Sequence, residues 1–297
     1  MWERKLRRVR YRVYILIATF IWGSSFVVTK DATAFVPPAQ VLAFRFAAAI
    51  PIVAIVFRSH LRTCLQPDYI RCGLTIGLVT FLAFFLQVSG LTFSTPGKNA
   101  FLTSLYCIIV PFLVWVASGK RPGANVFVAA VLCIVGVGFV NLDGGIGLQP
   151  GDGITLAGAF FYALQFLLLS RLSQGRDVFA LTIWYFVGAA ACSLVVLAVS
   201  GDAVPPNLVP PRTWACLVYL AVVVTAIALV LQNISMAHLP AATGSVLSSL
   251  ETVFAVLLSV AAGAEVLTPR IALGFAIMFA GIMCSEALPL LLQRRKR

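Results

Sequence analysis

The sequence predicts an all-α integral membrane protein with ten transmembrane helices built as two inverted five-helix repeats. Three observations predict this fold. The chain of 297 residues is 61% hydrophobic and only 11% charged, whereas an average globular chain carries about 25% charged residues. Its apolar residues form long runs separated by short breaks, and the second half of the chain repeats the pattern of the first. A soluble protein of this composition could not cover its core with polar surface.

Ten apolar segments are each long enough to span a bilayer, which takes roughly 20 mostly apolar residues. Charged or Pro/Gly-rich clusters separate them. The segments are 12–30, 38–57, 70–92, 98–117, 125–141, 152–171, 178–199, 212–235, 241–262 and 269–290. The connecting loops are short, so we expect no extramembrane domain. The basic N-terminus resembles the start of a signal peptide, but no small-residue cleavage site follows, and we interpret the first segment as an uncleaved membrane helix.

Basic residues set the orientation of these spans. The formal net charge is +12. If the N-terminus is cytoplasmic, the outer side holds Lys30, Lys98, Arg212 and Arg270, Arg45 lies within a span, and every other Lys and Arg lies on the inner side. This asymmetry follows the positive-inside rule and predicts a multi-pass protein of the cell (inner) membrane with both termini cytoplasmic. Because no basic run interleaves with exposed aromatics, nucleic-acid binding is not expected.

The chain contains an internal repeat. Residues 87–140 align with 232–285 without a gap, so that Gln87 falls on Gln232 and the span edges coincide. We therefore divide the chain into a first five-helix repeat, 1–145, and a second, 146–297, which together form one membrane domain. Because five is odd, the two halves enter the membrane with opposite orientation. Inverted repeats are typical of secondary transporters that bind their substrate near the bilayer midplane, between the halves.

Four short motifs occur in order along these spans: Trp22-Gly23-Ser24-Ser25-Phe26 in the first span, Arg45 in the second, Gly97-Lys98-Asn99-Ala100-Phe101-Leu102-Thr103-Ser104-Leu105-Tyr106 leading to Pro111 in the fourth, and Ser248-Ser249-Leu250-Glu251 in the ninth. Over nearly its whole length the chain resembles the EamA family of the drug/metabolite transporter superfamily. One departure is Thr252, which stands where the family often has Pro. Without that proline, a bend in the ninth span is not assured, whereas Pro111 is able to bend the fourth span.

The resemblance implies a ten-helix carrier for small metabolites that opens alternately to either side of the membrane. Members often export amino acids or related compounds. Together with the mixture of aromatic, hydroxyl and single charged groups in the spans, the resemblance predicts the export of a small, amino-acid-like amphipathic solute. The expected partners are this small-molecule substrate and the lipid bilayer, and no cofactor is expected.

Polar and aromatic side chains within the spans are the candidates for the substrate pathway. They come from spans of both halves and are Trp22, Arg45, Gln87, Asn99, Thr103, Tyr106, Tyr162, Gln165, Gln232, Ser245, Ser248, Ser249, Glu251 and Thr252. Each has a structural alternative. The aromatic residues could simply pack or contact lipid, and the amides could clamp helices across the repeat axis.

Two charged residues within spans are costly to insert, so each should face protein or water. Arg45 either attracts a carboxylate or phosphate of the substrate, or pins its helix to loop carbonyls. Glu251 lies near the middle of the ninth span, where the low dielectric favours its neutral, protonated form. It is therefore a candidate for proton coupling or amine binding. The alternative is a protonated side chain that holds a neighbouring helix.

Two polar stripes are related by the repeat. Ser245, Ser248, Ser249 and Thr252 follow helical spacing on the ninth span with Glu251 at their flank, and the matching stripe on the fourth span consists of Asn99, Thr103 and Tyr106. The alignment places Thr103 on Ser248 and Tyr106 on Glu251. Facing stripes would line a pathway, although small hydroxyl residues also allow close helix packing.

Other functional classes find little support in the sequence. The seven cysteines are scattered without a CxxC pair and do not cluster with the two histidines, so we expect no metal site. The Gly-rich run at 143–147 lacks the Gly-Lys-Ser/Thr ending of a phosphate loop. No arrangement of catalytic residues is apparent, so we expect no enzyme. Two alternatives remain open, an intramembrane enzyme acting on lipid head groups and a non-transporting helical scaffold.

Overall fold

The computed structural model describes residues 2–119, 121–141, 150–264, 266–270, 272–277, 279–281 and 283–284, and within these ranges all regular structure is helical. In chain order the helices are α1 (Trp2–Thr33), α2 (Pro38–Val56), η1 (Arg58–His60), α3 (Leu61–Cys64), α4 (Pro67–Thr92), α5 (Pro96–Ser104), α6 (Tyr106–Ser118), α7 (Ala124–Asn141), α8 (Pro150–Leu172), α9 (Val178–Ser200), η2 (Pro206–Leu208), α10 (Pro211–Tyr219), η3 (Leu220–Leu229), α11 (Val230–Met236), α12 (Ala241–Ser249) and α13 (Glu251–Ala261).

The predicted all-α membrane architecture is confirmed. Eight helices or contiguous helix runs are long and apolar enough to cross a membrane. Their ends, and those of α7, lie within a few residues of the predicted spans, except that α1 begins earlier than predicted. Of the predicted span 269–290, the structure describes a shorter apolar helix, Ala272–Gly281, while residues 285–290 lie outside the described residues.

Proline and glycine explain why the helix ends could be predicted. Proline begins α2, α4, α5, α8 and α10, a position where its missing N–H costs nothing and its fixed φ is already helical. Gly119 and Gly201 end α6 and α9 in the left-handed conformation, with φ of 71° and 68°. That conformation closes the last turn of a helix and is strained for residues that carry a Cβ.

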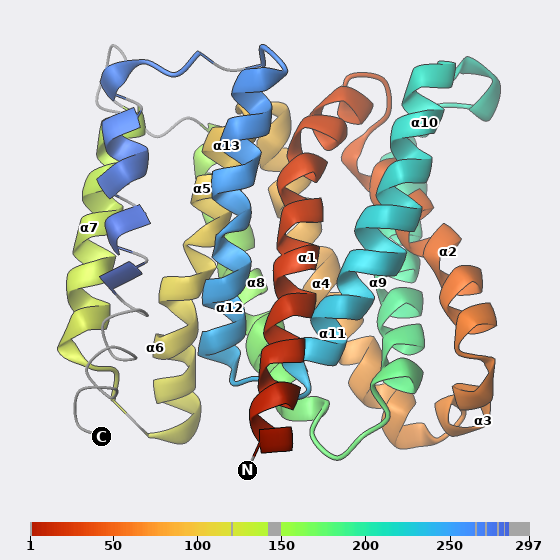
Figure 1. The fold of residues 1–297 in the computed structure, drawn as a ribbon. Helices are drawn as coiled ribbons and strands as arrows, with labels where there is room; N and C mark the ends of the chain where they lie inside the picture. Colours follow the sequence, from red (N-terminus) through yellow and green to blue (C-terminus); the bar gives the residue numbers. More distant parts are fainter. Residues whose placement is uncertain are drawn as a thin grey trace.

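The spans form a single bundle (Figure 1). In the view of Figure 1, α1 lies at the front, with α12 and α13 on one side and α10, η3 and α11 on the other. Helix α4 packs against α8 and α9, α2 packs against α9 and η3, and α1 packs against α13 and η3. The centre of the bundle is thus enclosed by helices from both halves of the chain.

Three spans depart from a regular α-helix. The fourth span breaks at Leu105, between α5 and α6, and the ninth breaks at Leu250, between α12 and α13. These breaks occupy equivalent positions in the repeat and have nearly the same backbone angles, φ −58° and ψ −14° against φ −62° and ψ −13°. The expected bend at Pro111 is therefore not the main interruption, because Pro111 lies inside α6. The eighth span contains the π-helix η3, which the sequence did not predict.

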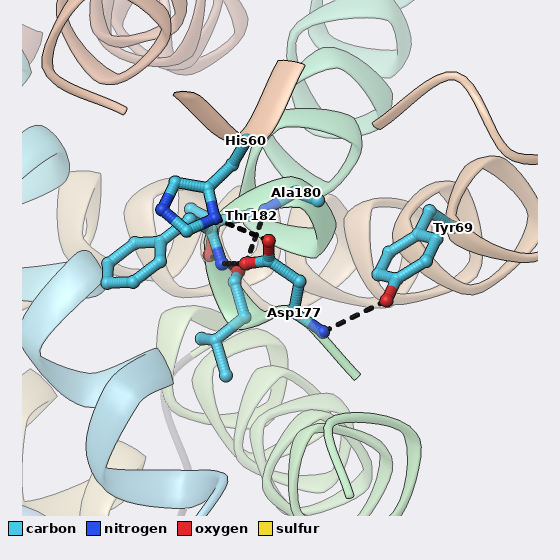
Figure 2. Close-up of polar contacts among 7 residues, drawn as sticks. His60, Tyr69, Asp177, Ala180 and Thr182 are labelled. Atoms are coloured by element: carbon cyan, nitrogen blue, oxygen red, sulfur yellow. Dashed lines mark hydrogen bonds and ion pairs between the residues drawn. The ribbon is translucent and has the colours of Figure 1, made fainter. Parts of the chain in front are cut away.

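At the end of the bundle where α1 begins, the segment between α2 and α4 contacts the loop between α8 and α9 (Figure 2). His60 Nδ1 lies 2.5 Å from Asp177 Oδ2, and the Asp177 backbone N–H donates to the hydroxyl of Tyr69 over 3.0 Å. The same Asp177 side chain caps α9 by accepting from the N–H groups of Phe179 and Ala180. Nearby, Arg176 Nε donates to Asp68 over 2.6 Å.

At the opposite end of the bundle, contacts between helix ends show the relative directions of α1 and α8. Lys30, near the end of α1, donates to the carbonyls of Leu91 and Thr92 at the end of α4 over 2.8 and 2.9 Å. Lys98, near the start of α5, pairs with the buried Asp152 near the start of α8 at 3.0 Å. Because the end of α4 also packs against the start of α8, α1 and α8 run in opposite directions.

A close approach between the backbones of α4 and α9 provides a test of the packing. A Cβ added at Gly77 in α4 would lie 2.5 Å from the Tyr185 carbonyl oxygen and 3.0 Å from the Ala189 nitrogen of α9. Backbone atoms cannot move aside easily, so Gly77→Ala should separate the helices and cost about 1–3 kcal/mol. We expect a clearly lower unfolding temperature of the detergent-solubilised protein.

Gly153 in α8 serves as the matched control, because an added Cβ there meets nothing within 4 Å. Gly153→Ala should leave the unfolding temperature unchanged or raise it slightly. Equal unfolding temperatures for the two variants would contradict the packing of α4 against α9 described here.

Candidate functional site

A narrow cavity lies between the two halves of the bundle. Its lining comes from α1, α4, α6 and α8 and from η3, α11 and α13, and consists of Trp22, Ser25, Phe26, Phe84, Gln87, Tyr106, Tyr162, Phe166, Leu229, Gln232 and Glu251. The cavity volume of about 30 Å³ has room for roughly two water molecules. A larger solute can therefore enter only if the surrounding side chains or helices move apart.

The two broken helices meet at this cavity. Tyr106 is the first residue of α6 and Glu251 is the first residue of α13, and the Tyr106 hydroxyl donates to Glu251 Oε1 over 3.3 Å. The two residues are 145 positions apart, which is the offset of the internal repeat. The repeat places Tyr106 and Glu251 at equivalent positions, and in the structure the two side chains are in contact. Both side chains are almost fully buried.

A hydrogen-bond network fixes one side of the cavity. Gln87 Nε2 donates to Thr103 Oγ1 over 3.3 Å, and the hydroxyl of Tyr162 donates to Gln87 Oε1 over 2.7 Å. Asn99 Nδ2 donates to the backbone oxygen of Gln87 over 3.2 Å and to Thr155 Oγ1 over 2.8 Å. These contacts join α4, α5 and α8 into a rigid wall whose polar groups mostly bond to one another.

Aromatic rings make up most of the remaining wall. Tyr106 stacks on Phe166 with ring centroids 5.0 Å apart, and lies 5.9 Å from Tyr162. Phe84 lies 5.1 Å from Tyr162 in a tilted arrangement. Such offset and tilted pairs are favourable contacts between rings. They leave one carboxyl, two amides and a few hydroxyls to interact with a solute.

Arg45 is buried, with 2% of its surface exposed, but it does not line the cavity. Its Nε donates to Thr225 Oγ1 of η3 over 3.0 Å, and its guanidinium carbon lies 4.8 Å from the centre of the Phe84 ring. Its Nη2 has no hydrogen-bond partner among the described residues. The guanidinium thus contacts Phe84, a lining residue, without being part of the lining itself.

The predicted pathway residues divide into two groups. Those that line the cavity are Trp22, Gln87, Tyr106, Tyr162, Gln232 and Glu251. Those outside the lining are Arg45, Asn99, Thr103, Gln165, Ser245, Ser248, Ser249 and Thr252.

Several residues of the second group bind other helices or their own backbone. Asn99 and Thr103 support Gln87, and Gln165 donates to the Tyr185 hydroxyl over 2.8 Å. Ser245 and Ser249 donate to carbonyls three residues earlier in α12, and Thr252 donates across the interruption at Leu250 to the Ser249 carbonyl.

Five lining residues were not among the predicted set: Ser25, Phe26, Phe84, Phe166 and Leu229. One signal was available for two of them, because the first spans of the two halves match loosely, with Trp22 and Phe26 falling on Tyr162 and Phe166. Phe84 and Leu229 lie in runs of other apolar residues, where no periodicity distinguishes a residue facing a cavity from one facing a neighbouring helix. Among the described residues, no group of His, Cys, Asp and Glu is placed to hold a metal ion.

Comparison with known proteins identifies the class of protein to which this cavity belongs. A solved structure matches 95% of this chain and 98% of its own with a TM-score of 0.72 at 20% identity, which establishes a shared fold. An "Uncharacterized transporter" of Archaeoglobus fulgidus is 28% identical over 287 residues, covering 94% of this chain and 87% of the relative. "Uncharacterized transporter YwfM" of Bacillus subtilis is 25% identical over 300 residues, covering 94% of each protein. The model of the EamA-like transporter family matches twice, over residues 10–142 and 149–286, so the chain belongs to this family of membrane transporters.

Proposed function

We propose that this protein is a secondary carrier that exports a small, amino-acid-like amphipathic metabolite by alternating access. The observation that carries the proposal is the cavity at which both broken helices meet, with Tyr106 and Glu251 in contact. Helices interrupted beside a central site are a recurring feature of transporters built from inverted repeats. The aromatic wall and the few polar groups suit a small solute with an apolar body and a polar head.

Alternating access is supported by the relation between the halves. We propose that residues 1–145 and 146–297 form two inverted repeats that rock about the cavity. The opposite directions of α1 and α8, the first helices of the two halves, support this arrangement. The breaks at Leu105 and Leu250 give each half a point where its gating helix can bend. The narrowness of the cavity is consistent with a state in which neither side is open.

The orientation in the membrane follows from the distribution of charge. We propose that the protein lies in the cell (inner) membrane, with the end of the bundle that carries His60 and Asp177 facing the cytoplasm and both termini on that side. The excess of Lys and Arg in the loops on this side supports the orientation. Lys30 and Lys98 then lie near the outer surface.

Two other functions, an intramembrane enzyme and a non-transporting scaffold, fit these observations less well. Members of the family are named as transporters, which disfavours an intramembrane enzyme acting on lipid head groups. The position of Glu251 at a helix break within the bundle also disfavours it, because an enzyme of that kind needs its polar centre near one lipid interface. A non-transporting scaffold would have no need of a solute cavity and would carry no flux.

Glu251 provides the first test of coupling. In proteoliposomes supplied with a mixed pool of amino acids and metabolites, the wild type should move at least one solute faster when a pH gradient is imposed. Glu251→Gln keeps the shape of the side chain but removes its ionisable proton, so the response to the gradient should disappear. Asp202→Asn, in an exposed loop, is the control for loss of a carboxylate and should behave as the wild type. An unchanged gradient response in Glu251→Gln would rule out the coupling role, and absence of any flux by the folded wild type would favour the scaffold.

Tyr106→Phe tests whether Tyr106 and Glu251 act as a unit. The change removes the hydroxyl donor but retains the ring that stacks on Phe166. We expect flux to fall about fivefold, equivalent to about 1 kcal/mol. The double variant Tyr106→Phe/Glu251→Gln should be no slower than Glu251→Gln alone, since the two changes interrupt one interaction. Additive losses in the double variant would show that the residues act independently.

A further inference from the structure

The two glutamines related by the internal repeat have different surroundings, although both line the cavity. The amide of Gln87 is engaged at both ends, with Nε2 donating to Thr103 and Oε1 accepting from Tyr162. Gln232 is more deeply buried, with 2% of its surface exposed, yet its Oε1 has no hydrogen-bond partner among the described residues. A buried carbonyl without a donor is unfavourable. Such a group at a binding cavity is best explained as one that awaits a ligand.

The reason for the difference lies in the residues opposite each glutamine. Tyr162 of α8 reaches Gln87 with its hydroxyl. The residue of α1 that aligns with Tyr162 is Trp22, whose indole Nε1–H instead points to the backbone oxygen of Val224 in η3 over 3.4 Å. The Trp22 indole is thus bonded to η3, and the Gln232 Oε1 remains without a donor among the described residues.

The charge and shape of the cavity indicate what could satisfy this acceptor. The only ionisable acid among the described lining residues is Glu251, and none of those lining residues is Lys, Arg or His. Six of the lining side chains are aromatic: Trp22, Phe26, Phe84, Tyr106, Tyr162 and Phe166. Aromatic faces attract ammonium groups through their ring quadrupoles. Arg45, which is outside this lining, lies over one face of the Phe84 ring.

We propose that the carrier recognises its solute by a positively charged ammonium group, held between Glu251 and Gln232 and enclosed by the aromatic side chains around them. The proposal rests on the proposed transport function and deepens it by assigning the head group of the substrate. Gln232 is assigned as a specificity residue that accepts from the ammonium group, whereas Gln87 is a structural member of the opposite wall. An anionic solute would meet the Glu251 carboxyl and the unsatisfied Oε1 of Gln232, and so should be disfavoured.

Three aromatic probes of similar shape test this selectivity on the intact purified protein: 2-phenylethylammonium, the neutral 2-phenylethanol and the anionic 3-phenylpropionate. Isothermal titration at neutral pH should give the tightest binding for the ammonium compound and the weakest for the anion. Equal affinities for all three, or preference for the anion, would overturn the proposal. This comparison uses only the wild type and so does not depend on the folding of any variant.

The role of Gln232 is tested with Gln232→Met, which has a similar volume but no carbonyl. A hydrogen bond to a charged group is worth enough that the affinity for 2-phenylethylammonium should fall about tenfold or more, while that for 2-phenylethanol should not change. Gln87→Met, in contrast, removes the hydrogen bonds of Gln87 to Thr103 and Tyr162. This variant should have a lower unfolding temperature but should keep the preference for the ammonium probe. An unchanged ammonium affinity in a folded Gln232→Met protein would show that the assignment of Gln232 is wrong.

The failure of this proposal can be distinguished from the failure of the transport function. If proteoliposomes carry solutes from the mixed pool but only ones that lack an ammonium group, the carrier function stands and the ammonium assignment is wrong. If no solute moves while 2-phenylethylammonium still binds selectively, the cavity is a cation-binding site in a protein that does not transport, and the proposed function is wrong.

Discussion

The contact between Tyr106 and Glu251 is the interaction around which the bundle is organised. Each residue follows directly after a helix break, and the two breaks are equivalent positions of a repeated chain. An ionisable group at this depth must have a partner, because a charge or an unsatisfied polar atom in an apolar interior is costly. The hydroxyl of Tyr106 supplies that partner from the other half of the chain. The need to satisfy Glu251 therefore ties the two halves together at the level of the cavity.

The positions of the spans could be predicted because local physics determines them. A run of about 20 apolar residues is most stable as a helix within the bilayer, and Pro at a first turn or Gly at a last turn marks its ends. The repeat identifies equivalent positions of the two halves but does not say which of them touch. Tyr106 and Glu251 are in contact, whereas Thr103 bonds to Gln87 of its own half rather than to Ser248.

The sequence was a poorer guide to the lining of the cavity. Ser245, Ser249 and Thr252 have the spacing of a polar stripe, but their hydroxyls bond to backbone carbonyls three residues earlier in the same span. Short hydroxyl side chains commonly do this, and it satisfies them without any ligand. The π-helix η3 was also missed, because a widened turn has no local signature in an apolar run. Its effect is large, since it directs Thr225 to Arg45 and the Val224 carbonyl to Trp22. Tertiary contacts of this kind determine which polar groups form hydrogen bonds within the protein and which have no partner there.

A chain built from two similar halves need not have two similar binding surfaces. If both halves had the same side chains, each hydrogen bond on one wall of the cavity would have a counterpart on the other. Here one wall is closed upon itself through Gln87, Tyr162 and Thr103. On the other wall the indole of Trp22 is held by η3, and the Oε1 of Gln232 is left without a partner among the described residues. Two halves with a similar order of helices are thus compatible with an asymmetric set of polar groups, because the apolar spans determine the helices whereas a few side chains determine which polar groups face the cavity.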